Sequence, residues 1–520
     1  MASAGPSDRG ASPARARGRL APAALAVAAL VAVAGCGGEG DGGEEAAGAG
    51  TADGRRPNVV VVMTDDHAVQ GWRRDLPRVD RLIARAGVTF ENSFVTTPLC
   101  CPSRATFLTG QYAHNHGVFE NHPGYPDLRD PPSVLPEWLR RAGYRTGHVG
   151  KWLNGYHRAP GSDGGAAPPP GWDEWDGLMQ AAYYNYDLSV NGRVEPHGEG
   201  PGDHANAVTT RYGLRFLRAE LGGPEPFFLS LAYVAPHVDR SSPAAGGKCG
   251  DAGFAVPAHE DVAAAERLST DPVSPAANEA DVSDKPRYVR LQPRLSATDL
   301  EAMRLRIGCE RASLRVVDRG VARILGAIRK AGELENTLVV FTSDHGFLHG
   351  EHRIAQGKSL PYDEAVRVPL AIRAPAPARQ VRVEGVAANI DLAPTILDYA
   401  GARPCLDDEA CRTLDGRSLR PLIEGPRADW PQPRAVLIEN TKRAYQICSW
   451  SAVRTKTEAF AQYGVSYGAG CGEREFELYD LARDPAELRN LADDPAHRRT
   501  YARLKEARDR LSQCAGSDCR

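Results

Sequence analysis

The sequence predicts an α/β protein built around a mostly parallel sheet. Apolar, β-branched runs alternate with segments of helical periodicity along much of the chain. The run at 58–63 contains four consecutive valines, as expected for a strand that is buried on both faces. Polar residues directly follow several of these runs, and open parallel sheets form their sites at the carboxyl ends of the strands.

The expected elements follow in chain order. Strands are expected at 58–63, 88–94, 144–149, 226–234 and 337–341, and helices at 76–86, from Cys100 onwards, and at 135–142, 209–221 and 297–331. The segments 159–170 and 240–285 are rich in small residues and proline and are expected to be long loops near strand ends. Such loops are either rims or lids of a pocket, or insertions without a role.

Length and charge limit the possible function classes. A chain of 520 residues exceeds one average core, so we expect one large and one smaller domain, or two comparable ones. The apolar fraction of 42% and charged fraction of 25% are typical of a globular protein. A net charge of −3 without a clustered basic excess argues against a nucleic-acid partner.

The N-terminus predicts export. Several arginines precede the apolar run 20–34, which is too short to span a bilayer comfortably and is typical of a signal peptide. The sequence 33–36 resembles a bacterial lipobox, which would place a lipid on Cys36; cleavage without lipidation is the alternative. Residues 37–54 are expected to form a flexible tether. We therefore expect an extracytoplasmic protein, lipid-anchored to the outer face of a bacterial cell membrane or secreted.

The stretch 97–110 combines a cysteine pair with an anion-binding environment. Pro102 suits the first turn of a helix, so Cys100 and Cys101 are expected at the positive end of that helix. Arg104 adds a permanent charge whose planar donors suit a tetrahedral oxyanion such as sulfate or phosphate. From composition alone, a cysteine pair in an exported protein is a disulfide participant or a buried thiol.

Polar residues also follow four of the expected strands. In chain order they are Asp65 and Asp66, Lys151, His237, and Asp344 with His345. A single pair of this kind usually forms a turn or a helix cap. Four of them on one sheet edge indicate a site. Three crowded carboxylates stay ionised only near a cation, so a hard divalent ion is the natural partner.

The order of residues from Cys100 to Gly110 resembles the sulfatase signature, C-x-P-S-R followed by L-T-G. In that family a formylglycine-generating enzyme oxidises the first residue, here Cys100, to formylglycine. The resemblance implies that the aldehyde is hydrated, that one hydroxyl attacks sulfur, and that the other later expels sulfate. Cys101 occupies the variable position and is expected to be structural.

The resemblance also implies an alkaline-phosphatase-like sulfatase fold, with a large mixed, mostly parallel sheet flanked by helices and a small C-terminal α+β subdomain. Residues 389–395 and 477–491 resemble the element that closes the large domain and the C-terminal subdomain. The expected division is a lipoprotein signal peptide at 1–35, a tether at 36–55, a catalytic domain at 56–402 and a C-terminal subdomain at 403–520.

Two residue sets carry over from the family. One would hold a single calcium ion: Asp65, Asp66, modified Cys100, Asp344 and His345. The other would contact formylglycine or sulfate: Arg104, Lys151, His237 and Lys358. His345 replaces the more widespread Asn, so its imidazole either ligates the ion or only donates a hydrogen bond. Fixed positive charge in the second set would stabilise the transferring group.

One departure from the family concerns the proton donor. Many sulfatases continue Gly-Lys-Trp with His, whereas Leu153 and Asn154 follow here. The acid for the leaving group is therefore assigned to His237, with Lys358 as the competing donor. Asp344 is expected to polarise the attacking hydroxyl.

The cysteines agree with export. After Cys36, Cys100 and Cys101 are set aside, eight remain: Cys249, Cys309, Cys405, Cys411, Cys448, Cys471, Cys514 and Cys519. Short spacing favours Cys405–Cys411 and Cys514–Cys519, and elimination leaves Cys448–Cys471 and Cys249–Cys309, a connectivity that sequence does not prove. Zinc is the rival interpretation, but no C-x-x-C pair or His at ligand spacing accompanies these cysteines.

The substrate is inferred from finer resemblance. The segments 150–156, 170–175, 184–186 and 344–359 resemble the glucosamine-6-sulfatase branch, which includes the heparan endosulfatases. This implies a 6-O-sulfated N-acetylglucosamine or glucosamine of a glycosaminoglycan, and the lack of a long basic insertion favours small or terminal sugars. Aromatic residues either stack on sugar rings or form core: Trp172, Trp175, Tyr183 and Tyr184.

Three rival functions remain open at this point. The same scaffold also carries phosphodiesterases and phosphonate monoester hydrolases, whose substrates share tetrahedral geometry with sulfate esters. A surface lipoprotein that binds sulfated glycans without turnover would keep an unmodified thiol at Cys100. In a purely structural tethered domain, the polar residues that follow four of the strands would have no function.

Overall fold

The computed structural model describes residues 55–158, 166–239, 249, 253–375, 380–408, 410–425, 434–440, 448–464 and 474–520. All of them belong to one compact unit, residues 47–520. The expected signal peptide, the lipid-bearing Cys36 and residues 36–54 of the tether lie outside the described residues, as do parts of the two expected long loops.

Two sheets and thirteen α-helices are found in the described residues. The large sheet contains β1 Asn58–Thr64, β2 Val88–Phe94, β3 Arg145–Lys151, β4 Glu174–Leu178, β5 Tyr186–Val190, β6 Arg193–His197, β7 Phe227–Ala232, β8 Thr337–Ser343, β9 Leu370–Arg373 and β10 Val381–Ala388. The small sheet contains β11 Val436–Asn440, β12 Trp450–Arg454, β13 Glu458–Tyr463 and β14 Phe476–Asp480. The longer helices are α3 Cys100–Thr109, α5 Leu135–Arg141, α6 Ala205–Glu220, α9 Ala297–Lys330, α11 Leu392–Ala400 and α13 Arg498–Leu511. The short ones are α1 Trp72–Asp75, α2 Pro77–Val79, α4 Ala113–His116, α7 Ala265–Leu268, α8 Arg287–Arg290, α10 Asp363–Val366 and α12 Arg420–Glu424.

The large sheet is parallel at its centre, antiparallel at β5, β6 and β9, and parallel again between the edge strand β10 and β2. Its strand order is β10-β2-β9-β8-β1-β7-β3-β4-β5-β6. The five strands from β8 to β4 run parallel to one another, whereas β9, β5 and β6 pair antiparallel with their neighbours. This confirms the predicted mixed, mostly parallel sheet. The carboxyl ends of β8, β1, β7 and β3 are adjacent.

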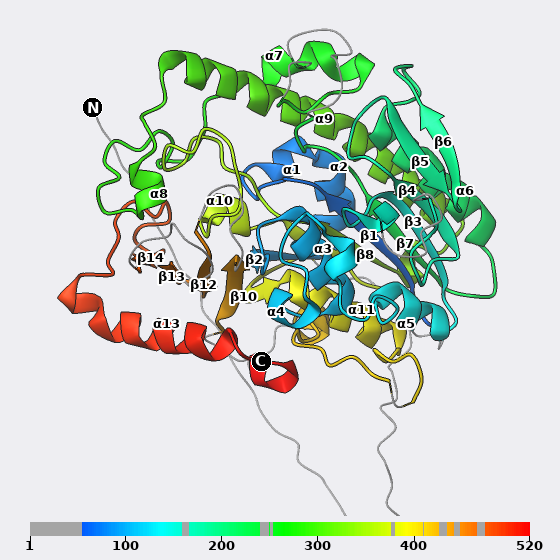
Figure 1. Cartoon of the computed structure of the whole chain (residues 1–520). Helices are drawn as coiled ribbons and strands as arrows, with labels where there is room; N and C mark the ends of the chain where they lie inside the picture. Colours follow the sequence, from blue (N-terminus) through cyan, green and yellow to red (C-terminus); the bar gives the residue numbers. More distant parts are fainter. Residues whose placement is uncertain are drawn as a thin grey trace, which may run out of the picture. The chain divides into compact units, whose positions relative to one another are not determined.

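Helices cover both faces of this sheet, because its central strands are apolar on both sides. Val60 and Val62 of β1 belong to a core cluster with residues of α6 and α9. Val59 and Val61 belong to the opposite cluster, with residues of α3, α5 and α11. Figure 1 shows α6 and α9 and, on the other side, α3, α5 and α11 around the central strands.

The small antiparallel sheet lies beside β2 and β10, with α13 alongside it (Figure 1). Glu439 of β11 donates its backbone N–H to Thr96, just beyond β2, at 2.9 Å. Apolar residues of both sheets share one cluster, which contains Phe94 of β2, Val386 of β10 and Trp450 of β12. The C-terminal region is therefore packed continuously against the large sheet.

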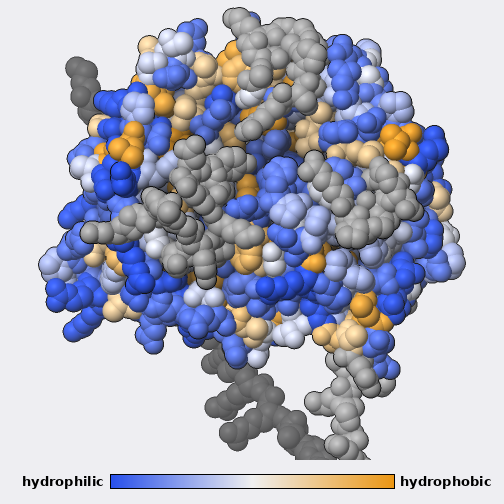
Figure 2. Space-filling model, in the orientation of Figure 1, coloured by the Kyte–Doolittle hydropathy of each residue, from blue (hydrophilic) through white to orange (hydrophobic). Residues whose placement is uncertain are grey.

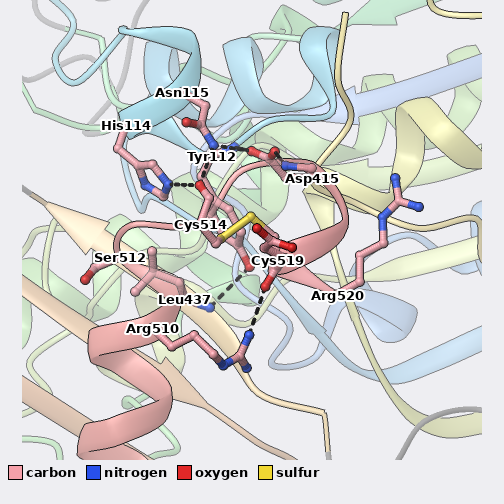
Figure 3. The surroundings of a disulfide bond; sticks show 12 residues. Tyr112, His114, Asn115, Asp415, Leu437, Arg510, Ser512, Cys514, Cys519 and Arg520 are labelled. Carbon is pink, nitrogen blue, oxygen red and sulfur yellow. Dashed lines mark hydrogen bonds between the residues drawn. A yellow bond between two sulfur atoms is a disulfide. The ribbon is translucent and has the colours of Figure 1, made fainter.

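The extreme C-terminus closes on α4 through a disulfide-bonded loop (Figure 3). The backbone oxygen of Cys514 lies 3.0 Å from His114 Nε2 and accepts a hydrogen bond from Asn115 at 2.9 Å. Gly516 donates its N–H to Asp415 at 2.7 Å. The chain end is thus fastened to the part of the protein that follows α3.

Three of the predicted disulfides are formed: Cys249–Cys309, Cys405–Cys411 and Cys514–Cys519. Cys448 is also disulfide-bonded, but its expected partner Cys471 lies outside the described residues. Cys100 and Cys101 are free and buried, so the disulfide alternative for this pair is wrong.

Most predicted elements match the structure, with four differences. Helix α6 begins at Ala205, four residues before the predicted start, and the predicted loop 240–285 contains helical turns over His259–Ala264 and Ala265–Leu268. The expected helix at 76–86 is a single turn, α2, continued by a π-helix over Asp80–Ala84, where buried Asp80 accepts hydrogen bonds from Arg73 and Arg85. Strand β3 extends to Lys151 instead of ending before it.

The aromatic residues proposed as sugar platforms are mainly core. Trp175, Tyr183 and Tyr184 are fully buried, and half-buried Trp172 stacks on Phe228. Within the described residues, no helix has both the length and the apolar character needed to cross a bilayer. The face drawn in Figure 2 is largely hydrophilic, with small scattered apolar areas.

Candidate active site

Four neighbouring strands deliver polar residues to one edge of the large sheet. Asp65 follows β1, Lys151 ends β3, His237 lies in the turn after β7 and Asp344 follows β8. Asp344 donates its backbone N–H to Thr64 of β1 at 3.1 Å, which joins the ends of these two strands. The predicted convergence at the carboxyl edge of the sheet is therefore present in the structure.

Helix α3 presents Cys100 to this edge. Cys100 is the first helical residue, and the Asn121 side chain accepts a hydrogen bond from the Cys101 backbone N–H at 2.9 Å. Cys100 Sγ lies 3.2 Å from Lys358 Nζ, 3.3 Å from His345 Nε2 and 3.8 Å from Asp65 Oδ1. The thiol therefore lies among charged groups at the positive end of a buried helix.

Three carboxylates converge around the thiol, as expected for a divalent cation. Ligand atoms of Asp65, Cys100, Asp344 and His345 all lie within 4.8 Å of one another, and those of Asp65, Asp66, Cys100 and His237 form a second such group. Asp66 Oδ2 is buried and has no hydrogen-bond partner among the residues that the structure describes. Buried carboxylate oxygens of this kind fit a hard cation such as calcium.

Cationic side chains surround the same carboxylates. Arg104 donates from Nε to Asp344 at 2.9 Å and from Nη1 to the Lys151 backbone oxygen at 2.9 Å, and its Nη2 lies 3.4 Å from Asp65. Lys151 forms an ion pair with Asp65. Arg104 therefore contacts residues at the ends of three of the four strands, β1, β3 and β8.

Lys358 and His237 both lie beside Asp66 and line the same cavity. Lys358 Nζ donates to Asp66 Oδ1 at 2.6 Å, and His237 Nε2 lies 3.7 Å from Asp66 Oδ2. His237 Nδ1 lies 2.6 Å from the Val238 backbone oxygen. The side chain is thus anchored at Nδ1, and Nε2 faces the site.

Charged neighbours in the cluster shift the pKa values of several groups against the effect of burial. Burial raises the pKa of the Cys100 thiol, but Lys151, Lys358 and His345 outweigh it, and the pKa is well below that of an ordinary thiol. Burial and the Asp344 charge raise the pKa of Asp65 to about 6, although Lys151 opposes them. Burial lowers the pKa of His345, but the negative charges of Asp344, Cys100 and Asp66 together outweigh it and raise the pKa to about 9.

Three residues of the charged cluster, Asp66, His237 and Lys358, line a cavity of about 310 Å³. Its polar lining includes Asp66, Asn121, Asn154, His237, Gln356 and Lys358, and its apolar lining includes Val238, Tyr288, Phe347, Ile354 and Leu360. The volume is at the lower end of the range for small-molecule sites, about 300–1,000 Å³. The polar lining residues can bind polar groups of a ligand, and the apolar lining residues can cover an apolar face of it.

Sequence reasoning missed three residues of this neighbourhood as site residues. Asn121 and Asn154 line the cavity, and Asn389 donates from Nδ2 to Ser103 Oγ at 2.9 Å in the first turn of α3. Asn154 had been noted only as a departure from the family's Gly-Lys-Trp-His pattern. Asn121 and Asn389 act across long sequence separations, so no local spacing marks them.

Comparison with known proteins identifies the family. The sulfatase family model matches residues 57–402. The chain belongs to the sulfatase family. A second model, described as N-sulphoglucosamine sulphohydrolase, C-terminal, matches residues 350–514. Together the two matches cover the large sheet and the small sheet of this sulfatase-family chain.

Individual relatives resemble most of the chain. The Extracellular sulfatase SULF-1 homolog of Drosophila melanogaster is 33% identical over 75% of this chain. This chain covers only 33% of the length of that relative, and 49% of the length of the putative extracellular sulfatase Sulf-1 homolog of Caenorhabditis elegans. Human N-acetylglucosamine-6-sulfatase is 30% identical over 90% of this chain and 86% of its own length. The structure of BT4656 in complex with its substrate D-glucosamine-2-N,6-O-disulfate has a TM-score of 0.65 at 23% identity and covers 88% of this chain and 98% of the other.

Proposed function

We propose that this protein is a sulfuric ester hydrolase that removes sulfate from glycosaminoglycan sugars, with Cys100 converted to formylglycine. The observation that supports this most directly is the environment of Cys100, whose Sγ lies within 3.8 Å of Asp65, His345 and Lys358 at the start of a buried helix. A formylglycine at this position supplies a hydrated aldehyde whose hydroxyl can attack sulfur. The Sγ position stands for that hydroxyl.

A single calcium ion is proposed beside this residue. Asp65, Asp66, Asp344 and His345 would hold it together with residue 100, and the unpartnered Asp66 Oδ2 supports this choice. The ion would supply positive charge next to the attacking and sulfate oxygens. Arg104 orients two of its carboxylates, since it contacts both Asp344 and Asp65.

The remaining cations are assigned to the transferring group. Lys151 and Lys358 stabilise the negative charge that develops on the sulfate oxygens in this buried setting. His237 donates the proton to the leaving oxygen from Nε2, because its Nδ1 is held by the Val238 carbonyl and its Nε2 faces the cavity. Lys358 is the competing donor. Asp344 polarises the attacking hydroxyl.

The proposed substrate is a 6-O-sulfated N-acetylglucosamine or glucosamine. The relatives named N-acetylglucosamine-6-sulfatase, and the similar structure that holds a 6-O-sulfated glucosamine, support this choice. A cavity of about 310 Å³ suits a terminal sugar, with the apolar face of the ring against Tyr288 or Phe347.

The cellular proposal follows from the N-terminus. The protein is exported, matured by a formylglycine-generating enzyme, and attached to the membrane through lipid on Cys36, with a catalytic domain at 56–402 and a C-terminal subdomain at 403–520. The relatives named extracellular sulfatases support the extracytoplasmic location. Replacing Cys36 by alanine should release the protein from the membrane fraction.

Peptide mass spectrometry of protein from its own host tests the nucleophile. The peptide that contains Cys100 should lose thiol mass and react with an aldehyde trap. The same preparation is assayed on sulfate, phosphate and phosphonate esters, with Cys100→Ala as the control. Faster turnover of phosphate or phosphonate esters would favour the hydrolase alternative on this scaffold. An unmodified Cys100 in native material would favour glycan binding without turnover.

A further inference from the structure

A second cavity, distinct from the active-site cavity, is lined mainly by arginine. It has a volume of about 160 Å³ and is lined by residues of α1, α2 and α9. Figure 1 shows α1 and α2 beside α9. Five arginines line it, namely Arg74, Arg78, Arg311, Arg315 and Arg319, together with Asp75, Pro77, Leu268 and Asp318. In a chain whose net charge is −3, this is a local concentration of positive charge.

The helical repeat of α9 aligns three of the five arginines. Arg311, Arg315 and Arg319 are four residues apart on α9, so their side chains share one face of the helix. Arg74 and Arg78 come from the segment α1–α2, which is fastened to α9 through the buried carboxylate of Asp318. That carboxylate accepts hydrogen bonds from the backbone N–H groups of Arg78 and Val79 at 2.7 and 3.0 Å.

Three buried carboxylates hold the five guanidinium groups in place. Asp75 accepts from Arg74 Nε at 3.0 Å and from Arg311 Nε at 2.8 Å. Asp318 accepts from Arg78 Nη1 at 3.0 Å. Because each of these carboxylates is at most 7% exposed, it fixes its arginines without filling the cavity.

The third carboxylate, Asp261, holds Arg315 and Arg319. It accepts from Arg315 Nε at 2.7 Å and from Arg319 Nη2 at 2.6 Å, and exposed Glu260 adds a contact to Arg319. Five positive charges therefore share three buried negative charges and one exposed one. Arg78 and Arg315 each contact a carboxylate through one guanidinium nitrogen, and their side chains are 47% and 50% exposed, so the rest of each guanidinium group is accessible to a ligand.

We infer that this arginine pocket binds a tetrahedral oxyanion of the sulfate type. Guanidinium groups present paired donors that match sulfate oxygens, and groups that are already oriented lose little entropy on binding. The cavity is several times the roughly 30 Å³ that one water occupies, which suits one anion rather than a sugar chain. The anion is either free sulfate or a sulfate ester on a second unit of a longer glycan.

The pocket is separated from the active site by an acidic region. A third cavity shares Asp66 with the active site and Arg74, Asp75 and Arg311 with the arginine pocket. Its lining includes the carboxylates of Asp271, Glu310 and Glu351, whose negative charges would repel sulfate. The arginine pocket is therefore a separate binding site and not an exit path for the product of the active site.

Selenate, an anomalous scatterer with the shape of sulfate, tests the site. Crystals of the full chain grown without sulfate or phosphate are soaked in sodium selenate. The wild type should show a selenium peak within hydrogen-bond distance of Arg315. Arg315→Gln should weaken binding about tenfold, the value of one charge-assisted hydrogen bond, and remove the peak. Arg323→Gln, about two turns further along α9 and outside the lining, is the matched control and should keep it.

Kinetics distinguish the two sources of the anion. If the group comes from a longer glycan, Arg315→Gln should raise KM about tenfold for a multiply sulfated tetrasaccharide and leave KM for a monosulfated monosaccharide unchanged. If it is free sulfate, the selenate peak appears and both KM values stay the same. The inference is overturned if the wild type lacks the selenium peak and Arg315→Gln leaves both KM values unchanged. It is also overturned if Arg315→Gln retains the peak as Arg323→Gln does. Selenate binding does not require modified Cys100, so this result is independent of the proposed activity.

Discussion

Trp450 of the small sheet donates its indole N–H to the backbone oxygen of Ser359 at 2.9 Å, and Ser359 directly follows Lys358. The Ser359 N–H in turn donates to Pro98, just before α3, at 3.1 Å. Ser359 has a φ of 69°, a left-handed conformation that its neighbours must maintain. The C-terminal sheet therefore helps to place a cation of the active site.

Trp450→Phe should impair activity more than stability. The substitution keeps an aromatic ring in the core but removes the hydrogen bond that holds Ser359, so Lys358 loses part of its support. We expect kcat/KM to fall about tenfold while the free energy of unfolding falls by about 1–2 kcal/mol. Phe460→Leu, a buried aromatic residue of the neighbouring strand β13 whose side chain makes no hydrogen bond to Ser359, is the control. Equal loss of kcat/KM in both variants would show that general destabilisation is responsible.

Arg104→Lys should reduce activity severely although the charge is kept. A lysine cannot contact Asp344, Asp65 and the Lys151 carbonyl together, so the carboxylates lose their common support. We expect kcat/KM to fall about a hundredfold. Steady-state kinetics on the best sulfate ester measure this. Arg85→Lys, a charge-conserving change at Asp80, should leave kcat/KM unchanged; wild-type kinetics for Arg104→Lys would contradict the assigned role.

Removal of calcium should lower the melting temperature. A ligand that binds only the folded state stabilises it in proportion to the logarithm of its concentration over Kd. Treatment with a calcium chelator should lower Tm, and added calcium should restore it. Asp66→Asn should abolish this response, whereas Asp408→Asn, at a 96% exposed side chain, should keep it. A wild-type Tm that is the same with and without calcium would refute the proposed ion site.

Asn389→Ala should loosen the start of α3. The Asn389 side chain accepts from the Thr96 N–H at 3.1 Å and donates to Ser103 Oγ at 2.9 Å, and its loss leaves buried polar groups unpaired. We expect the free energy of unfolding to fall by about 2–3 kcal/mol and kcat to fall with it. Urea titration and kinetics measure the two effects. Asn92→Ala removes an exposed side-chain hydrogen bond and should change neither.

The contact of His114 with the C-terminus should depend on pH. Burial lowers the pKa of His114, but its hydrogen bond to Glu439 and the charge of Glu439 outweigh this and raise it. A raised folded-state pKa means that the stabilisation is complete below the unfolded pKa of about 6.5 and is lost as pH rises through the folded pKa.

His114→Gln should therefore destabilise the protein more at pH 5.5 than at pH 9. The expected difference is about 1–2 kcal/mol, typical of a charged hydrogen bond. Urea unfolding at both pH values measures it, with His259→Gln on the surface as the control. The same loss of stability at both pH values would show that the charge of His114 contributes nothing.

Much of the fold was predictable because strand and helix patterns are local. The valine run of β1, the strand Val88–Phe94 and the 34-residue helix α9 were recognised from periodicity alone. The strands β4–β6 and β9–β14 were not predicted individually. Several of them are short, and β6 is mostly exposed, so their side chains carry little apolar periodicity.

The sequence by itself predicted the members of the charged cluster. The C-x-P-S-R signature at Cys100 and the polar residues after four strands indicated most of them, because a parallel sheet must bring adjacent carboxyl ends together, and the family resemblance added Lys358. The tertiary structure decided what supports and surrounds them. Asn389 orients α3, Trp450 holds the Lys358 loop, and two short segments meet α9 to form the arginine pocket. These contacts join residues far apart in the chain, and only packing of the whole fold brings them within reach.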